Sequence, residues 1–158
     1  MKQRILFLCT GNSARSQMAE ALLRLIAGDH FEVESAGTHP AGLNPMTIES
    51  MQETGVDVRH YRSKNLDEFV GQPFDYVITV CDRAKESCPV FPGASNLRHW
   101  SFDDPAQAPL DSRREVFRLV RDEIANRLCQ FLIEEVRFAP TALQCDCCKV
   151  QLKPDPIA

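Results

Sequence analysis

The chain has 158 residues, enough for one domain with a complete hydrophobic core, and its 44% hydrophobic and 25% charged residues are typical of a globular protein. The formal net charge of −4 argues against nucleic-acid binding and against docking on acidic membranes. Neither a secretory signal nor a stretch of membrane-spanning length is recognisable, so we expect a cytoplasmic protein.

Strand and helix patterns alternate along the chain. Apolar runs predict strands at 4–8, 31–35, 76–80 and 96–100, and helical spacing predicts helices at 16–27 and from 44 to about 55. A single helical turn is expected at 66–69, and 81–88 is expected to be a polar segment that can move. The last helix opens with a capping-box pattern at Ser112 and Glu115 and ends before Pro140. Its apolar stripe fits packing on a sheet: Phe117, Val120, Ile124, Leu128 and Phe131.

The alternation predicts a single α/β domain over residues 1–138. Parallel strands joined by right-handed helical crossovers give a flavodoxin-like, four-stranded parallel sheet in the order 2-1-3-4, with helices on both faces. Residues 139–158 contain three prolines and little periodicity, and we interpret them as a cysteine-containing tail.

Residues 9–16 carry the strongest chemical signal. Cys9 follows the first strand, Arg15 follows after five intervening residues, and the loop then leads into a helix N-terminus, which offers free N–H groups. Gly11 and Asn12 tolerate the positive φ angles that turn successive N–H groups inward. The pattern predicts a loop that holds a tetrahedral oxyanion under a nucleophilic sulfur, with binding groups from Thr10, Gly11, Asn12, Ser13, Ala14, Arg15 and Ser16.

The same field should act on the thiol of Cys9. A helix N-terminus and the guanidinium of Arg15 lower the pKa of a nearby thiol, so we expect the resting sulfur to be a thiolate. The alternative is a buried cysteine that only packs.

Two further cysteines and an aspartate join this picture. Cys81 ends the third strand, at the same sheet edge as Cys9, and Cys88 lies seven residues on. Such a pair can support a disulfide relay in which Cys81 attacks a Cys9 adduct and Cys88 then attacks Cys81, although both could also be incidental. Asp104, held by the following proline, is the candidate general acid, with Asp103 as a competitor and turn formation as the alternative role.

Residues 3–137 resemble the thioredoxin-coupled arsenate reductases of the low-molecular-weight protein tyrosine phosphatase superfamily. The matching pieces are the loop from Cys9 to Glu20, the Glu-Ser-Ala-Gly at 34–37, the strand ending at Cys81, the Cys-Pro at 88–89 and His-Trp-Ser-Phe-Asp-Asp-Pro-Ala at 99–106. The resemblance implies that Cys9 attacks arsenate, Arg15 holds its oxygens and Asp104 protonates the departing hydroxide. It also implies that Cys81 releases arsenite from Cys9, and that thioredoxin reduces a Cys81–Cys88 disulfide.

Some relatives bind potassium near this loop through an Asn, a Ser and an Asp. Asn12 and Ser35 match, but Lys64 stands where the Asp is expected, and its ammonium would take the place of the ion unless it is a solvated surface lysine. Ala14 replaces a cysteine that many members carry before the loop arginine. We therefore expect no bound metal and no tightly bound cofactor, with thioredoxin, or else glutaredoxin, as external reductant of a monomer.

Two other functions stay open. The same loop and acid would hydrolyse a phosphotyrosine, but Pro105 is followed by Ala106 and Gln107 rather than by aromatic residues, which favours the reductase. A second alternative is an arsenite- or metal-binding module in the tail, since three thiolates suit a soft metal or trivalent arsenic: Cys145, Cys147 and Cys148.

Overall fold

The four predicted strands form one parallel sheet. The computed structural model describes residues 1–87 and 91–137 and contains β1 (Gln3–Cys9), β2 (Phe31–Gly37), β3 (Phe74–Thr79) and β4 (Ala94–His99). All pairings are parallel and the order is β2-β1-β3-β4, so the predicted α/β class and strand order are confirmed. The strand ends differ from the predicted ones by at most two residues.

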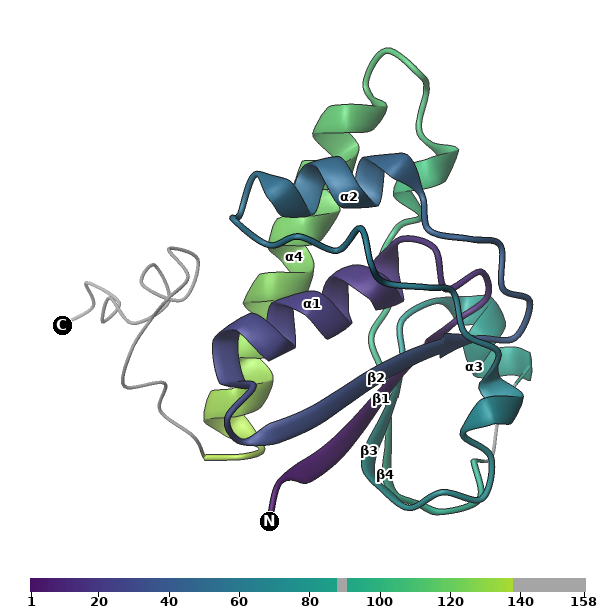
Figure 1. Ribbon diagram of the computed structural model, residues 1–158, viewed down its shortest axis with the longest axis vertical. Coiled ribbons are helices and arrows are strands. Elements are labelled where there is room, and N and C mark those ends of the chain that lie inside the picture. Colours follow the sequence, from purple (N-terminus) through teal and green to yellow (C-terminus); the bar gives the residue numbers. More distant parts are fainter. Residues whose placement is uncertain (88–90, 138–158) are drawn as a thin grey trace, which may run out of the picture.

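The longer helices gather on one side of this sheet. Figure 1 shows α1 (Arg15–Ala27), α2 (Pro45–Gln52) and α4 (Arg113–Glu134) together, with α4 crossing behind α1. Three short elements complete the described chain: η1 (Leu66–Glu68), α3 (Asp82–Ser87) and η2 (Pro105–Gln107). Because the strands are parallel, the loops that follow β1 and β3 emerge at the same edge of the sheet, where open α/β sheets bind their ligands.

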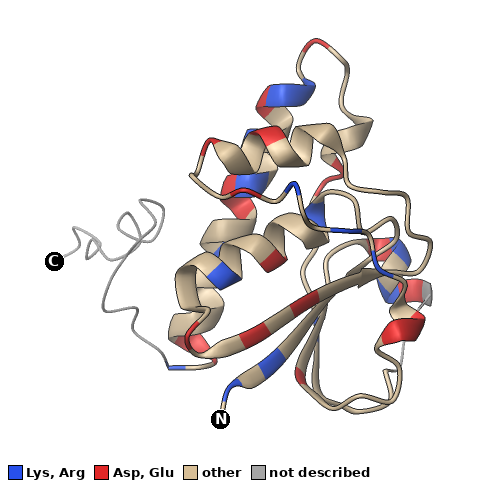
Figure 2. Ribbon diagram, in the orientation of Figure 1, with Lys and Arg blue, Asp and Glu red and all other residues tan. Residues whose placement is uncertain are grey.

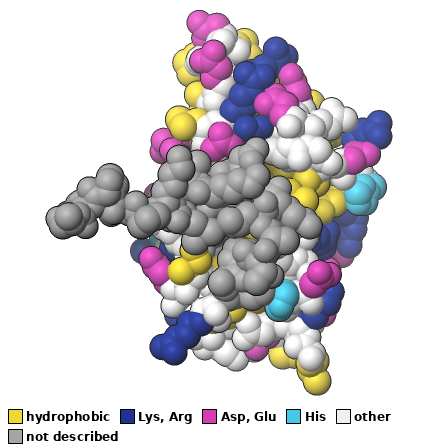
Figure 3. Space-filling model, turned by 90° about the vertical axis from the view of Figure 1, so that its left-hand side faces the viewer, with side chains coloured by type: hydrophobic (Ala, Val, Ile, Leu, Met, Phe, Trp, Pro, Cys, Tyr) yellow, Lys and Arg dark blue, Asp and Glu magenta, His cyan; other side chains and the backbone are white. Residues whose placement is uncertain are grey.

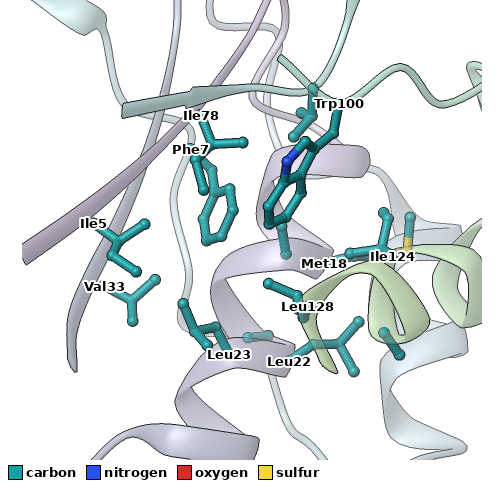
Figure 4. Packing of buried hydrophobic residues seen from close by; sticks show 14 of the residues in the cluster. Ile5, Phe7, Met18, Leu22, Leu23, Val33, Ile78, Trp100, Ile124 and Leu128 are labelled. Atoms are coloured by element: carbon teal, nitrogen blue, oxygen red, sulfur yellow. The ribbon is translucent and has the colours of Figure 1, made fainter. Parts of the chain in front are cut away.

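The main core lies between the sheet and the helices α1 and α4. In Figure 4, Phe7 of β1 and Trp100 stand side by side above Met18, Leu23 and neighbouring aliphatic residues, and the two ring centroids are 6.0 Å apart. The predicted stripe on α4 is buried throughout. A smaller cluster covers the other face of the sheet: Leu6, Leu8, Ala36, Phe69, Phe74, Val77 and Phe91. Each large side chain buried in these clusters stabilises the fold by roughly 1.5–3 kcal/mol.

The two predicted helix starts differ in outcome. The side chain of Asn44 accepts a hydrogen bond from the N–H of Met46 at 2.9 Å, so Asn44 caps α2 ahead of Pro45 as predicted. The capping box at Ser112 is wrong, because Ser112 makes no side-chain cap and its hydroxyl instead donates to the carbonyl of Pro109 at 3.3 Å. A turn that precedes α4 therefore competes for the hydroxyl that the pattern assigns to the helix.

The segment after β3, for which the sequence predicted a polar character but no helix or strand, is helical. Residues 82–87 form the short helix α3. Of the side chains described from Asp82 to Glu86, only Ala84 is buried, so this helix has no apolar periodicity that a sequence pattern could reveal.

Charges of both signs are interspersed over the helices (Figure 2). Around the grey atoms, the face seen in Figure 3 mixes basic, acidic and hydrophobic side chains. Among the described helices, none combines the length and the hydropathy that crossing a bilayer requires.

Candidate active site

The loop that follows β1 is held in place through its backbone carbonyls. The segment 38–44 runs alongside it and donates a hydrogen bond to nearly every loop carbonyl, at 2.9–3.2 Å: Thr38 to Cys9, His39 to Thr10, Ala41 to Gly11 and Asn44 to Ser13. The carbonyl of Asn12 accepts from the side chains of Gln17 and Ser63. In the described part of the chain, the N–H groups of Gly11, Ser13 and Ala14 have no acceptor. With the carbonyls engaged elsewhere, these N–H groups form a cradle for an anion.

Only one of the two predicted residues takes a left-handed conformation. Asn12 has φ 47° and is fully buried, whereas Gly11 has no positive φ, so the prediction for Gly11 is wrong. The glycine that the loop does require is Gly37, at the end of β2. A Cβ atom there would lie 2.5 Å from the carbonyl oxygen of Thr10 and 2.9 Å from the nitrogen of Asn12. The Ser-Ala-Gly sequence at a strand end was the available signal for this close approach.

Cys9 lies beneath the cradle and is 3% exposed. Its sulfur accepts a hydrogen bond from the N–H of Asn12 at 3.0 Å and lies 2.8 Å from the hydroxyl oxygen of Ser16. Burial raises the pKa of the Cys9 thiol, although the hydrogen bonds from Ser16 and Asn12 and the charge of Arg15 each lower it. The expected lowered pKa is therefore wrong, because the desolvation of a nearly inaccessible sulfur outweighs the field of the loop.

Arg15 and Asp104 face each other across the site. Arg15 is the first residue of α1, and its guanidinium donates to the carbonyl of Phe102 at 3.0 Å and lies 3.7 Å from the Asp104 carboxylate. The other carboxylate oxygen of Asp104 accepts the N–H of Ala106 and so caps η2. Asp104 thus combines the predicted turn role with a position at the site. Asp103 also lines the cavity but is exposed.

The two thiols that the sequence singled out share one cavity. A cavity of about 690 Å³ is lined by Cys9, Cys81, Arg15, Asp104 and parts of the loop and of α3. Cys81 is buried, and its sulfur lies 3.5 Å from the hydroxyl oxygen of Thr10. The predicted meeting of Cys9 and Cys81 at one sheet edge is therefore observed. Cys88 and the tail cysteines Cys145, Cys147 and Cys148 lie outside the described residues.

A buried polar network supports the loop from the side away from the cavity. The side-chain amide of Asn12 donates to the hydroxyl oxygens of Ser16 and Ser35, both at 2.9 Å. The hydroxyl of Ser35 in turn donates to the carboxylate of Glu20. A continuous chain of hydrogen bonds thus links the sulfur of Cys9 to the buried carboxylate of Glu20. It passes through Ser16, Asn12 and Ser35.

Lys64 closes this network, and its side chain is only 11% exposed. Its ammonium lies 2.8 Å from the carboxylate of Glu34 and 3.4 Å from that of Glu20, while its backbone N–H donates to the side-chain oxygen of Asn12. Lys64 is therefore not a solvated surface lysine, because its ammonium is held between two carboxylates.

Glu20 is a site residue that sequence reasoning missed. It is 1% exposed and pairs with Arg24 at 2.7 Å as well as with Lys64. Burial raises the pKa of Glu20, while Lys64, Ser35 and Arg24 lower it. The available signal was its position one helical turn after Ser16 and one turn before Arg24, which places all three on one face of α1.

Comparison with known proteins gives a consistent result. Residues 4–142 match the model of the family described as low molecular weight phosphotyrosine protein phosphatase. An arsenate reductase of Bacillus subtilis is 43% identical over 129 residues, which cover 80% of this chain and 93% of the relative.

Solved structures agree with the sequence relatives. A structure described as an arsenate reductase in oxidized state is 30% identical, has a TM-score of 0.71 and covers 85% of this chain and 98% of its own. A thioredoxin-dependent arsenate reductase of Corynebacterium glutamicum is 30% identical, has a TM-score of 0.63 and covers 85% of this chain and 64% of its own. With the fold, the Cys9 loop and the family model in agreement, the chain belongs to the low molecular weight phosphotyrosine protein phosphatase family.

Proposed function

We propose that the protein is an arsenate reductase that couples a phosphatase-like anion site to a thiol relay. Cys9, Arg15, Cys81, Cys88 and Asp104 are its catalytic residues, and the loop from Thr10 to Ser16 binds the substrate oxyanion. The proposal is supported by the names of relatives such as the arsenate reductase of Bacillus subtilis and by the geometry around Cys9.

The first step is substitution at arsenic. Arsenate binds to the N–H groups of the loop and to the guanidinium of Arg15, which bring positive charge beside the sulfur of Cys9 and favour its thiolate. The Cys9 sulfur attacks arsenic and forms a sulfur–arsenic bond, while an arsenic–oxygen bond breaks. Asp104 gives a proton to the departing hydroxyl group of arsenate, which leaves as water. Because burial raises the pKa of Cys9, the thiol has to release its proton to solvent before its sulfur attacks.

The second step transfers two electrons. The Cys81 thiolate attacks the sulfur of Cys9, a sulfur–sulfur bond forms and the electrons of the sulfur–arsenic bond pass to arsenic. Arsenic leaves as trivalent arsenite, and Cys9 and Cys81 remain as a disulfide. Cys88 then attacks Cys81, which frees Cys9 and leaves a Cys81–Cys88 disulfide for an external thiol reductant.

The observation that carries this proposal is the place of Cys81. A second buried cysteine in the cavity of the nucleophile, in contact with Thr10 of the anion loop, has no role in phosphate ester hydrolysis. It has a direct role in releasing a reduced product from Cys9.

We further propose thioredoxin as the reductant, Lys64 as a built-in cation that removes the need for potassium, and Ser35 as the support of Asn12. The neighbouring structure of a thioredoxin-dependent enzyme favours this reductant over glutaredoxin. A monomer in the reducing cytoplasm fits a chemistry that depends on free thiols.

A coupled assay tests the function directly. Oxidation of NADPH is followed with arsenate as substrate, once with a thioredoxin system and once with a glutaredoxin system. We expect arsenate-dependent turnover with thioredoxin and its loss in Cys81→Ser. Turnover by Cys81→Ser equal to that of the parent protein would remove the relay from the mechanism.

Phosphate ester hydrolysis is the second candidate activity. The cradle, Arg15 and Asp104 suit any tetrahedral oxyanion, and the family model is that of phosphatases. After Asp104, however, the cavity wall is made by Ala106 and Gln107, so that Phe102, before Asp104, is the one aromatic residue among the described residues that line the cavity. We therefore expect weak hydrolysis of small aryl phosphates, through Cys9 and without a need for Cys81.

A further inference from the structure

His99 joins three elements at the edge of the site. Its Nδ1 atom lies 2.7 Å from the hydroxyl oxygen of Thr79, at the end of β3. Its Nε2 atom lies 2.9 Å from the carboxylate of Asp82, the first residue of α3. The hydroxyl of Ser101 reaches the same carboxylate oxygen at 3.4 Å. The imidazole therefore bridges the carboxyl ends of β3 and β4 to the start of α3.

The bridge matters because α3 has few other ties. A six-residue helix is too short to be stable by itself. Among its described side chains only Ala84 is buried, and its first turn is closed by a hydrogen bond from the N–H of Lys85 to the carbonyl of Cys81 at 3.2 Å. Cys81 immediately precedes Asp82, so whatever fixes Asp82 also fixes the direction in which the Cys81 thiol points.

We propose that His99 is a positioning residue for Cys81. By holding Asp82 against the strand ends, the imidazole keeps the first turn of α3 docked and the Cys81 sulfur turned toward the cavity that it shares with Cys9. This inference rests on the proposed relay and assigns to His99 a part in its second step only. The first step does not involve His99, since the described residues that line the cavity do not include it.

The contact between His99 and Asp82 is partly open to water, with 22% of the His99 side chain and 72% of the Asp82 side chain exposed. An exposed pair of this kind gives a moderate effect, so its loss should slow arsenite release on the order of fivefold rather than abolish it. Because both side chains act through one contact, the second substitution should add little to the first.

The test measures arsenite released in a single turnover at saturating arsenate, without reductant. The variants are His99→Leu, which removes both contacts of the ring, His99→Gln, which keeps a donor for Asp82, Asp82→Ala, and the double variant His99→Leu/Asp82→Ala. Arg98→Leu is the matched control, because Arg98 lies beside His99 in β4 but pairs with Glu135 at the end of α4.

We expect both single losses to slow release, the double variant to be no slower than the slower single one, and His99→Gln and Arg98→Leu to remain close to the parent protein. The KM for arsenate should not change in His99→Leu. Wild-type release rates in His99→Leu and Asp82→Ala, losses that multiply in the double variant, or an equal loss in Arg98→Leu would each overturn the proposal. If His99→Leu does not fold, His99→Phe, which keeps the volume of the ring and removes both of its polar contacts, decides the matter, because Asp82 itself lines the cavity.

Two arms separate this inference from the proposed function. If the parent protein releases no arsenite, or if Cys81→Ser releases it at the parent rate, the relay itself fails. If arsenite release requires Cys81 but proceeds at the parent rate in His99→Leu and Asp82→Ala, the relay stands and the role of His99 fails.

Discussion

The Cys9 loop and the segment around Cys81 face one cavity but are built in opposite ways. The loop is fixed by hydrogen bonds to its carbonyls and by a fully buried Asn12. The Cys81 segment is a short helix with one buried side chain among those described from Asp82 to Glu86. An anion cradle works only if its donors are placed in advance, whereas a thiol that reacts with two partners in turn has to change position. The difference indicates that the Cys9 loop is the rigid part of the site and that the Cys81 segment is the part that moves during thiol–disulfide exchange.

The largest effect is expected at the rigid part. Cys9→Ser should reduce arsenate turnover by roughly a thousandfold or more, because a hydroxyl near neutral pH is a far poorer nucleophile than a thiolate. The cradle is made of backbone groups and should still bind phosphate or sulfate. Turnover is measured in the coupled assay and binding by calorimetry with phosphate. Retained turnover would refute the central role of Cys9.

The exchange part is tested by Cys88→Ala. If Cys88 acts only after arsenite has left, this variant should release about one arsenite per protein molecule and then stop with a Cys9–Cys81 disulfide. The measurement is an arsenite count in a single turnover, followed by peptide mapping of the disulfide. Continued turnover with thioredoxin at the parent rate would exclude Cys88 from the relay.

Ser16→Ala tests how hydrogen bonding and burial together set the pKa of the Cys9 thiol. Removing the hydroxyl takes away a hydrogen bond that lowers the Cys9 pKa and so opposes the effect of burial. The pKa of Cys9 should therefore rise further. Because a raised thiol pKa leaves less thiolate at neutral pH, activity near pH 7 should fall on the order of tenfold and recover as the pH rises. The readout is the pH profile of the single-turnover rate. A profile that keeps its midpoint while its height falls would show that Ser16 acts through geometry alone.

Lys64→Asp tests the built-in cation. Without the ammonium, Glu20 and Glu34 lose a shared partner and the new carboxylate adds negative charge beside them. Activity or melting temperature should then depend on potassium relative to sodium at equal ionic strength, whereas the parent protein should not distinguish the two. The melting temperature should shift by a few degrees, as expected for a change of about 1 kcal/mol. Equal responses of parent and variant to the two ions would remove this role from Lys64.

The smallest effect is expected from truncation after Pro140. The tail lacks the apolar periodicity of a core element, so the fragment 1–140 should keep its fold and its arsenate reduction within about twofold. Steady-state reduction and arsenite binding are compared for the full chain and the fragment. Loss of arsenite retention alone would support a thiol-binding role for the tail. Loss of turnover would show that the relay runs through Cys145, Cys147 or Cys148.

Local pattern was sufficient for the frame of the molecule. Periodicity and turn residues predicted the strand order and the cap at Asn44. The rule that parallel strands end at one edge predicted the place of the Cys9 loop and the meeting of Cys9 with Cys81. These features depend on residues close in sequence or on the topology that such residues impose.

Other features were decided by contacts between distant segments. The network around Asn12 brings together three separate segments of the chain, which contribute Glu20, Ser35 and Lys64. A glycine is required at position 37 only because the end of β2 lies against the backbone of the Cys9 loop. The pKa of Cys9 shows the physical reason most clearly. The sequence by itself determined the donors that lower this pKa, namely the helix start, Ser16 and Arg15. Only the tertiary structure decided how much water reaches the sulfur, and desolvation depends on every segment packed over the site rather than on any spacing along the chain.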